Sequence, residues 1–243
     1  MIIVPARLKS TRFPNKVLED IGGIPMIIRV ANIAKKVDDV VIATDEEEVK
    51  EVCKKYNIQA ILTSKTHNSG TDRVAECARI LKLPQNELVI NMQGDEPFLE
   101  VEVILALKKI MQEKSIGGKL PFMGTCIKEI SSQEAQNPNL VKAIFNKEME
   151  AIYFSRSLIP YDRENFMQEN HISYYGHLGI YAFSNASLQE FCTLPKSNLE
   201  EIEKLEQLRA IENKKTIVVA KVQSASFGID TQEDLIKAKK IFL

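Results

Sequence analysis

Short apolar runs alternate with amphipathic stretches along the first half of the chain. Apolar runs of strand length cover residues 1–4, 40–44, 59–63 and 87–92. Between and after them, apolar residues at helical spacing predict helices over 26–36, from Asp45 to about residue 56, from Arg73 onward, and from about 100 to 114. Asp45 is expected to cap the second of these helices. Strands and helices that alternate in this way are joined by right-handed crossovers. The pattern therefore predicts an α/β fold with a doubly wound, mostly parallel sheet covered on both faces.

The pattern changes after residue 114, where strands dominate. Apolar, aromatic or alternating runs cover 123–130, 140–145, 151–155 and 174–183, with turn residues at 137–139 and 146–148. Consecutive strands with short links predict an antiparallel extension, and the second turn is expected to close a hairpin. We therefore expect one domain over residues 1–243, with a strand-rich subregion at 119–195. The polar stretch at 161–169 lacks a period and predicts a flexible loop.

A capping box at Ser197 and Glu200 predicts a helix that continues to about residue 213. Its apolar residues recur at every third position, so they drift around the helix instead of forming one stripe. We therefore expect contacts from several sides, which would bring Glu206, Gln207 and Arg209 close to other elements. A last strand at 216–222 and a terminal helix follow, and Thr231 is expected to cap that helix.

Composition excludes several classes of protein. The net charge is −1, which argues against a general nucleic-acid binder. The apolar runs are too short to span a membrane. The four cysteines form no C-x-x-C pair, so reduced thiols are expected. We therefore expect a soluble cytoplasmic protein with neither a nucleic-acid nor a membrane partner.

The loop after the first apolar run is strongly basic. Four cations and two hydroxyls precede the first acid: Arg7, Lys9, Ser10, Thr11, Arg12 and Lys16. A buried strand that leads into such a loop suits a polyphosphate, which needs fixed donors and a positive field. The alternative is a solvated basic loop after an edge strand.

Polar residues also follow the third strand. Ser69 or Thr71 can cap the next helix, while Gly70 permits close approach of a ligand and Arg73 offers a forked donor. Because ligands of such sheets bind beyond the carboxyl ends of the strands, this segment could also bind a base or a phosphate. Both interpretations remain open.

Two acids, Asp95 and Glu96, follow the fourth strand, with Gly94 before them. Next to a polyphosphate loop they suggest Mg²⁺, which takes one or two carboxylates together with phosphate oxygens and water. An ordinary acidic turn is the alternative. The chain contains neither G-x-x-x-x-G-K-[ST] nor G-x-G-x-x-G, and no nucleophile–base set stands out. The remaining residues suit attack on the α-phosphorus of a nucleoside triphosphate, with pyrophosphate leaving.

Together, several motifs resemble those of the 3-deoxy-manno-octulosonate (Kdo) cytidylyltransferases, or CMP-Kdo synthetases. They occur in the family's order along almost the whole chain, at residues 5–16, 67–73, 93–97, 137–139, 153–156, 177–181, 205–209 and 228–231. The resemblance implies a nucleotide-diphospho-sugar transferase-like fold and a homodimer built through the strand-rich half. It also implies transfer of CMP from CTP to Kdo for lipopolysaccharide synthesis, by Mg²⁺-assisted in-line attack of the sugar 2-hydroxyl on the α-phosphate.

The resemblance also assigns site residues. The nucleotide site would comprise Ala6, Arg7, Ser10, Arg12, Lys16, Ser69, Thr71, Arg73 and Gln93. Asp95 and Asp230 would hold Mg²⁺ and act in catalysis with Arg7, Arg12 and Lys16. The sugar acid would bind to Arg156, His177, Tyr181, Glu206 and Gln207. A hydrogen-bonded structural role is the alternative for His177.

One residue departs from the family pattern. Asn15 stands where the family usually has glycine, although asparagine tolerates a left-handed backbone. Cytidylyltransferases for other acidic sugars, such as sialic acid, have a similar fold but a glycine-rich first loop, which residues 7–12 do not match. A non-catalytic nucleotide-binding module is the other alternative. It would require a broken phosphate or metal site, whereas Lys16, Asp95 and Asp230 are all present.

Overall fold

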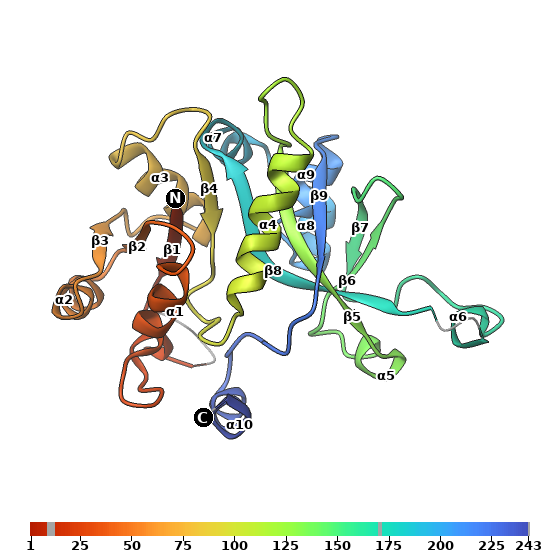
Figure 1. The fold of residues 1–243 in the computed structure, drawn as a ribbon, viewed down its shortest axis with the longest axis horizontal. Coiled ribbons are helices and arrows are strands. Elements are labelled where there is room, and N and C mark those ends of the chain that lie inside the picture. Colours follow the sequence, from red (N-terminus) through yellow and green to blue (C-terminus); the bar gives the residue numbers. More distant parts are fainter. Residues whose placement is uncertain (9–12, 170–171, 243) are drawn as a thin grey trace. The chain divides into compact units, whose positions relative to one another are not determined.

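A computed structural model describes residues 1–8, 13–169 and 172–242 of the chain. The chain divides into two compact units (Figure 1): the first comprises Met1–Leu105 and Ser224–Leu243, and the second Ala106–Gln223. The single domain with a strand-rich subregion at 119–195 stays a prediction. None of the helices in the described ranges is long and apolar enough to cross a membrane.

The first unit contains four parallel strands that lie next to one another in the sheet. Its strands are β1 (Ile2–Ala6), β2 (Val40–Thr44), β3 (Gln59–Leu62) and β4 (Leu88–Asn91), in the order β3-β2-β1-β4. The register pairs Ile2 of β1 with Val40 of β2 and with Ile90 of β4. β1 and β2 are buried almost throughout, as expected for strands covered on both faces. The predicted parallel sheet is confirmed.

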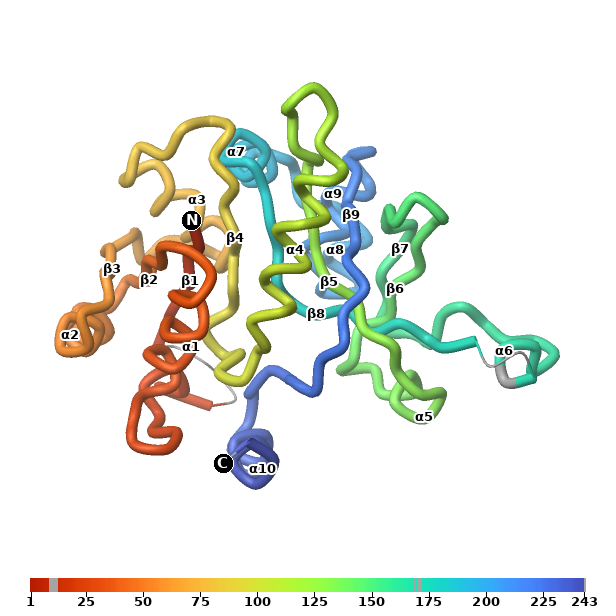
Figure 2. The backbone as a smooth tube through the Cα atoms, viewed as in Figure 1, coloured from red at the N-terminus to blue at the C-terminus, as the bar shows by residue number. Residues whose placement is uncertain are grey.

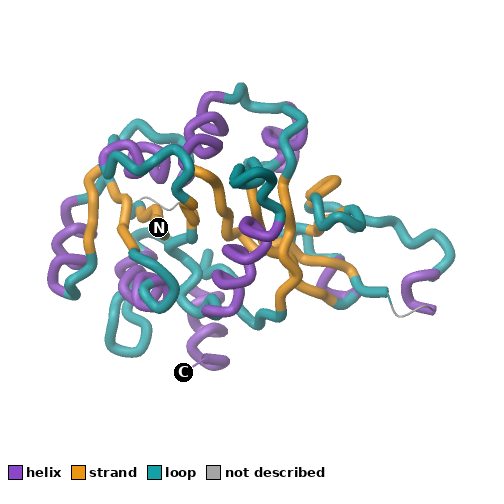
Figure 3. The backbone as a smooth tube through the Cα atoms, turned by 45° about the horizontal axis from the view of Figure 1, so that its top comes forward, coloured by secondary structure: helices purple, strands orange, loops and turns teal. Residues whose placement is uncertain are grey.

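Helices alternate with these strands (Figure 3). They are the 3₁₀-helix η1 (Lys16–Leu18), α1 (Met26–Ala34), α2 (Glu47–Lys55), α3 (Gly70–Ile80), the first part of α4 (Val101–Glu113), and α10 (Gln232–Phe242). Because the chain runs from β1 outward to β3 and then returns to β4, right-handed crossovers place α1 and α2 on one face and α3 on the other. The strand order thus reverses between β1 and β4, which is where open sheets of this kind bind ligands.

The C-terminal segment returns to the N-terminal part of the same unit (Figure 2). Ile229 and Leu235 pack with Phe13, Ile21 and Met26 in one apolar cluster. The Ile229 amide donates to the Asp95 carbonyl oxygen at 2.9 Å. Burial of these side chains therefore brings the residues after 228 to the end of β4. The predicted cap of α10 is confirmed, since Thr231 Oγ1 accepts from the Asp234 amide.

The second unit is built mainly from antiparallel strands. They are β5 (Met123–Ile130), β6 (Lys142–Phe145), β7 (Ala151–Ser155), β8 (Tyr174–Ser184) and β9 (Ile217–Val222). β5 and β8 are antiparallel, and β6 and β7 form the predicted hairpin. β9 runs parallel to β5, a pairing that the strand pattern did not predict.

Among its described residues, this unit wholly contains the helices or helical turns α5 (Ser132–Ala135), α6 (Phe166–Glu169), α7 (Asn185–Thr193), α8 (Asn198–Glu203) and α9 (Leu208–Glu212). The predicted single helix over 197–213 is wrong. Its capping box is present, but Lys204 adopts φ 53° and ends α8. The drifting apolar residues therefore belong to two short helices. α6 lies in the stretch predicted to be a loop.

Candidate active site

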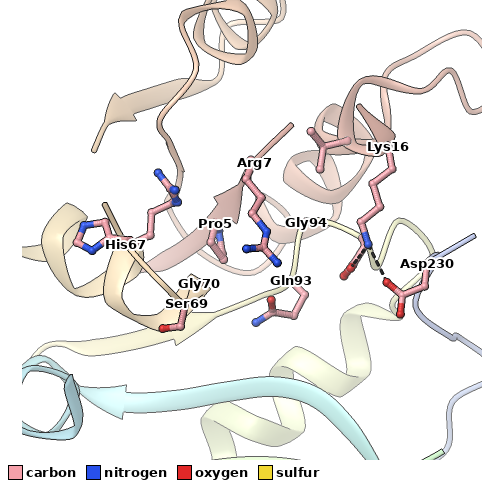
Figure 4. Close-up of a pocket in the computed structure, with 13 residues that line it drawn as sticks. Pro5, Arg7, Lys16, His67, Ser69, Gly70, Gln93, Gly94 and Asp230 are labelled. Atoms are coloured by element: carbon pink, nitrogen blue, oxygen red, sulfur yellow. Dashed lines mark hydrogen bonds and ion pairs between the residues drawn. The ribbon is translucent and has the colours of Figure 1, made fainter. Parts of the chain in front are cut away.

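A cavity of about 320 Å³ lies in the first unit, at the carboxyl ends of β1 and β4 (Figure 4). It is lined by Pro5, Ala6, Arg7, Lys16, Val17, His67, Ser69, Gly70, Arg73, Gln93, Gly94, Asp95 and Asp230. These residues come from the segments that follow β1, β3 and β4 and from the turn before α10. The cavity thus lies where the strand order reverses, at the carboxyl ends of the strands, as the sequence predicts.

Lys16 joins the two predicted metal carboxylates. Its ammonium Nζ lies 2.6 Å from Asp95 Oδ2 and 2.9 Å from Asp230 Oδ1, and it also donates to the Ile229 carbonyl at 3.1 Å. The Lys16 side chain is 12% exposed. Burial alone would lower the pKa of Lys16, but the two carboxylates outweigh it and the pKa is raised. Lys16 is therefore a fixed positive charge at neutral pH.

Asn15 holds the backbone that carries Lys16. It adopts the left-handed conformation, with φ 58° and ψ 14°, which asparagine tolerates better than most residues. The Asn15 amide donates to the Leu8 carbonyl, and the Leu18 amide donates to the Asn15 carbonyl. The expectation that asparagine can replace glycine here is confirmed. The predicted phosphate ligands Ser10 and Arg12 lie outside the described residues.

Two glycines let the backbone approach Pro5 along the cavity wall. A Cβ atom at Gly94 would lie 2.9 Å from the Pro5 carbonyl oxygen, closer than real Cβ contacts allow. At Gly70 it would lie 3.2 Å from Pro5 Cγ, which is also tight. The absence of side chains at these positions therefore allows the segments after β1, β3 and β4 to meet.

The residues after β3 combine capping with cavity lining. Ser69 Oγ accepts from the Asp72 amide at 3.1 Å and caps α3, and Ser69 also lines the cavity. Gln93 lines the cavity, and its Nε2 donates to Asn91 Oδ1 at 3.2 Å. Thr71 is 3% exposed, accepts from Asn91 Nδ2 and lies behind the lining residues. Both predicted roles of Ser69, as cap and as cavity residue, are thus compatible with its position.

Arg73 is a buried cation of the cavity wall. Its Nη1 donates to Thr63 Oγ1 at 2.6 Å, and its Nη2 lies 3.1 Å from Asp45 Oδ2. The prediction that Asp45 caps the following helix is wrong: the N-cap position of α2 is Glu46, and no side chain caps it. Asp45 instead orients Arg73. No donor among the described residues reaches its other oxygen, Oδ1.

We expect Asp45→Asn to raise the KM for the nucleotide about tenfold or more, since truncating a buried charge pair costs a few kcal/mol and leaves Arg73 without its carboxylate. kcat at saturating nucleotide should change much less. Steady-state kinetics with Glu46→Gln as the neighbouring control checks this. An unchanged KM for the nucleotide in Asp45→Asn would show that Arg73 does not depend on Asp45.

In the second unit, His177, Tyr181 and Gln207 form a polar cluster. The rings of His177 and Tyr181 lie 5.5 Å apart, and the Tyr181 hydroxyl donates to Gln207 Oε1 at 3.1 Å. Thr125 Oγ1 donates to the Ile180 carbonyl at 2.8 Å and lies 2.9 Å from His177 Nε2. The single proton of this hydroxyl is directed at the backbone carbonyls of Ile180 and Leu178, at 2.8 and 3.2 Å. Nε2 of His177 is therefore assigned as the donor to Thr125 Oγ1, which leaves Nδ1 as an acceptor.

Burial keeps this cluster neutral. It lowers the pKa of His177 to about 3, and burial together with the nearby Glu206 raises the pKa of Tyr181. Gln207 is 2% exposed, and its Nε2 has no acceptor among the described residues. A neutral imidazole nitrogen and an amide donor can together recognise hydroxyl groups. The cluster therefore offers an uncharged polar surface to a ligand.

The depressed pKa of His177 predicts a pH dependence of stability. The unfolded histidine takes up a proton near pH 6.5 whereas the folded one does so only near pH 3. The free energy of unfolding is therefore expected to fall as the pH drops below about 6.5, by up to about 1.4 kcal/mol per pH unit from this group. Urea unfolding of the wild type and of His177→Gln between pH 7 and pH 4.5 checks this prediction. The part of the pH dependence of the free energy of unfolding that His177 contributes should be absent in the variant. Equal pH dependence in the two proteins would contradict the prediction.

Arg156 is held by a separate set of contacts. Its Nε donates to the Glu203 carbonyl at 2.8 Å, and its Nη1 donates to the Pro138 carbonyl at 3.1 Å. The fully buried Lys142 donates to the carbonyl oxygens of Arg156, Leu140 and Asn137. The turn at 137–139 and the end of α8 thus fix the position of the guanidinium.

Other reactive groups of the described residues have structural roles. Cys53, Cys77 and Cys126 are buried, and burial raises the pKa of their thiols to between about 11 and about 12. They are inert thiols at neutral pH. Within the described ranges, no group of three or more His, Cys, Asp or Glu side chains is placed to hold a metal.

The sequence patterns predict the wrong role for Asp45 and no role for His67. Asp45 follows β2 directly, a position that signals a rim residue but equally a helix cap. His67 lines the cavity and pairs with Glu76 of α3. The pairing crosses nine positions of the chain, so the motif that contains His67 does not reveal it.

Comparison with known proteins identifies relatives over the full length of the chain. A family model described as Cytidylyltransferase matches residues 1–217. The 3-deoxy-manno-octulosonate cytidylyltransferase of Wolinella succinogenes is 55% identical over 242 residues, covering 100% of this chain and 99% of the relative. The protein of the same description from Helicobacter pylori is 55% identical over 243 residues, covering 100% and 97%.

Solved structures agree with the fold. The structure of CMP:2-keto-3-deoxy-manno-octonic acid synthetase complexed with CTP matches with a TM-score of 0.90 and 37% identity, covering 99% of this chain and 96% of that chain. A cytidylyltransferase from Leptospira borgpetersenii matches with a TM-score of 0.62 at 16% identity, over 100% of this chain and 87% of the other, which supports the fold alone. The predicted α/β fold class is confirmed.

Proposed function

Since the chain belongs to the 3-deoxy-manno-octulosonate cytidylyltransferase family, we propose that this enzyme transfers CMP from CTP to Kdo, forming CMP-Kdo and pyrophosphate. The observation that carries the proposal within the chain is the rim of β1 and β4, where Lys16, Asp95 and Asp230 meet beside Arg7 in one cavity. A polyphosphate binds to such cations, and two carboxylates suit a divalent cation.

The reaction forms one bond and breaks one. The oxygen of the Kdo 2-hydroxyl bonds to the α-phosphorus of CTP, and the bond between that phosphorus and the α,β-bridging oxygen breaks. The pyrophosphate carries away the electron pair, and the hydroxyl loses its proton. Catalysis of this transfer consists mainly of positioning and of neutralising the charge on the phosphates.

Arg7 and Lys16 bind the triphosphate in this proposal. Arg7 lines the cavity and is exposed, so its guanidinium is open to a phosphate. Lys16 supplies a point charge from a side chain that is mostly buried. Ser10 and Arg12 are proposed to add donors from the same loop, by resemblance to the family. Together these residues would stabilise the charge on the leaving pyrophosphate.

We assign recognition of cytidine to other residues that line the same cavity. Ser69, Arg73 and Gln93 line the cavity next to Ala6, and each carries a hydrogen-bonding side chain. Arg73 is fixed by Thr63 and Asp45, which makes it a preorganised donor. We propose that these side chains read the base, while Thr71 supports the wall through Asn91.

Asp95 and Asp230 are proposed to hold Mg²⁺. The residues fit the ion, because two carboxylate oxygens from different segments already surround one cation, the Lys16 ammonium, at 2.6 and 2.9 Å. Mg²⁺ is usually held by one or two carboxylates together with substrate phosphates. When bound, the ion would neutralise phosphate charge and polarise the α-phosphate. The protein's part is to keep both carboxylates in place.

We propose that Kdo binds to the second unit. Gln207 presents a buried amide nitrogen without an acceptor among the described residues, and His177 presents its Nδ1 acceptor. Tyr181 and Glu206 lie close together, because the charge of the Glu206 carboxylate contributes to the raised pKa of the Tyr181 hydroxyl. Arg156, anchored by Glu203 and Pro138, is proposed as the partner of the sugar carboxylate.

Further properties follow from the family resemblance alone. We propose a cytoplasmic homodimer that uses the strand-rich half as its interface and supplies CMP-Kdo for lipopolysaccharide synthesis. Light scattering of the purified protein tests the dimer, and a monomer at assay concentration would contradict it.

A pyrophosphate-release assay tests the proposed function. The enzyme is supplied with CTP, UTP, ATP or GTP, each with Kdo, with N-acetylneuraminate or with no sugar. We expect release with CTP and Kdo far above every other combination. Preferential release with N-acetylneuraminate would favour a sialic-acid cytidylyltransferase, and binding of CTP without release would favour a non-catalytic module.

A further inference from the structure

Lys16 occupies a position that a divalent cation would need. Its Nζ lies within hydrogen-bond distance of three oxygens, Asp95 Oδ2, Asp230 Oδ1 and the Ile229 carbonyl, at 2.6, 2.9 and 3.1 Å. An ammonium group has three donors, so these acceptors can satisfy all of them. The same oxygens are hard ligands of the kind that Mg²⁺ and Mn²⁺ take.

An ammonium and a divalent cation compete for these carboxylates. Like charges a few ångströms apart repel strongly in a partly buried site. The two cations would also compete for Asp95 Oδ2 and Asp230 Oδ1, the oxygens that Lys16 contacts. Binding of one cation at these oxygens therefore opposes binding of the other.

The site stays assembled without the ammonium. The Ile229 amide donates to the Asp95 carbonyl at 2.9 Å, which joins the two acidic segments through their backbones. Ile229 is fully buried in the apolar cluster with Met26 and Leu235. The backbone before Lys16 is held by the Asn15 and Leu18 hydrogen bonds. Only the flexible lysine stem needs to move for the ammonium to change partners.

We propose that Lys16 is the internal counter-ion of Asp95 and Asp230, which weakens metal binding before the nucleotide is present. This rests on the proposed function in one respect: the triphosphate of CTP supplies the alternative partner for the ammonium. Once Lys16 binds phosphate, its contacts with Asp95 and Asp230 are released and no longer oppose the metal. Metal and nucleotide therefore bind cooperatively, and Lys16 couples them.

Binding of Mn²⁺ alone, measured by calorimetry without nucleotide or sugar, tests the proposal. We expect Lys16→Met to bind Mn²⁺ at least about tenfold more tightly than the wild type, because the competing charge is gone. Lys35→Met is the matched control: Lys35 lies in the same unit and donates to the Asn57 carbonyl outside the cavity. Its Mn²⁺ affinity should equal that of the wild type.

Two further measurements make the result decisive. A non-hydrolysable CTP analogue should strengthen Mn²⁺ binding far more in the wild type than in Lys16→Met. Thermal unfolding should show Lys16→Met to be destabilised without metal and restored by Mn²⁺, and Lys16→Gln should show the same at smaller amplitude. Mn²⁺ affinity in folded Lys16→Met or Lys16→Gln that is no higher than in the wild type would overturn the proposal. Because the first measurement uses metal alone, it stands even if the enzyme fails to turn over Kdo.

Discussion

Asp230→Asn is expected to lower kcat for CMP transfer by at least about 100-fold, while the affinity for CTP falls much less. The substitution keeps the size of the side chain and removes one of two negative charges beside Lys16. Fewer than two carboxylates would then hold the metal, and the charge that develops on the pyrophosphate would lose its main stabilisation. Asp95→Asn is expected to have the same effect.

Glu96→Gln is the matched control. Glu96 directly follows Asp95, but its carboxylate accepts from Ser226 Oγ at 3.4 Å and does not line the cavity. Single-turnover rates and CTP titrations of the three variants separate chemistry from binding. Near-normal turnover by Asp230→Asn at limiting Mg²⁺ would contradict the assignment of this carboxylate.

Arg209→Met is expected to destabilise the protein by about 3–5 kcal/mol, because it leaves the buried Glu200 carboxylate without its counter-ion. Arg209 and Glu200 are 6% and 10% exposed, and they form two hydrogen bonds of 2.8 and 2.5 Å. The guanidinium also lies over the Phe191 ring at 4.8 Å. This pair joins α9 to the start of α8 across the break at Lys204.

The double variant Glu200→Gln with Arg209→Met should recover much of the loss, since it removes the unpaired charge as well. Lys196→Met is the surface control: its ion pair with Glu201 is more than half exposed on both sides, so solvent screens it and it contributes little to stability. Urea unfolding followed by circular dichroism compares them. Equal stability of Arg209→Met and Lys196→Met would refute a stabilising role for the buried pair.

Local patterns were sufficient where the structure depends on local burial. The bounds of β2, β5 and β7 agree with the runs that predict them, because each run pairs with neighbouring strands of a sheet over its length. The parallel order in the first unit follows from the alternation of strands and helices. By contrast, the break after α8 occurs at Lys204, a residue type that carries no signal for a left-handed backbone.

Tertiary contacts determine what the patterns left open. Lys16 meets Asp95 and Asp230 across 79 and 214 positions of the chain, and no local spacing encodes that meeting. The cations and Asp95 were identified from strand ends, whereas Asp230 was assigned only through family resemblance. The sequence predicts that Asp45 caps the following helix, because a carboxylate at the end of a strand can serve as a helix cap. In the structure Asp45 pairs with Arg73 instead.

Kdo that carries ¹⁸O at its 2-hydroxyl identifies the attacking atom. The enzyme is incubated with CTP and the labelled sugar, and the masses of both products are measured by mass spectrometry. We expect the label in CMP-Kdo, in the oxygen that joins the sugar to phosphorus, and unlabelled pyrophosphate. Absence of CMP-Kdo, or CMP-Kdo without the label, would contradict attack of the Kdo hydroxyl on the α-phosphorus of CTP.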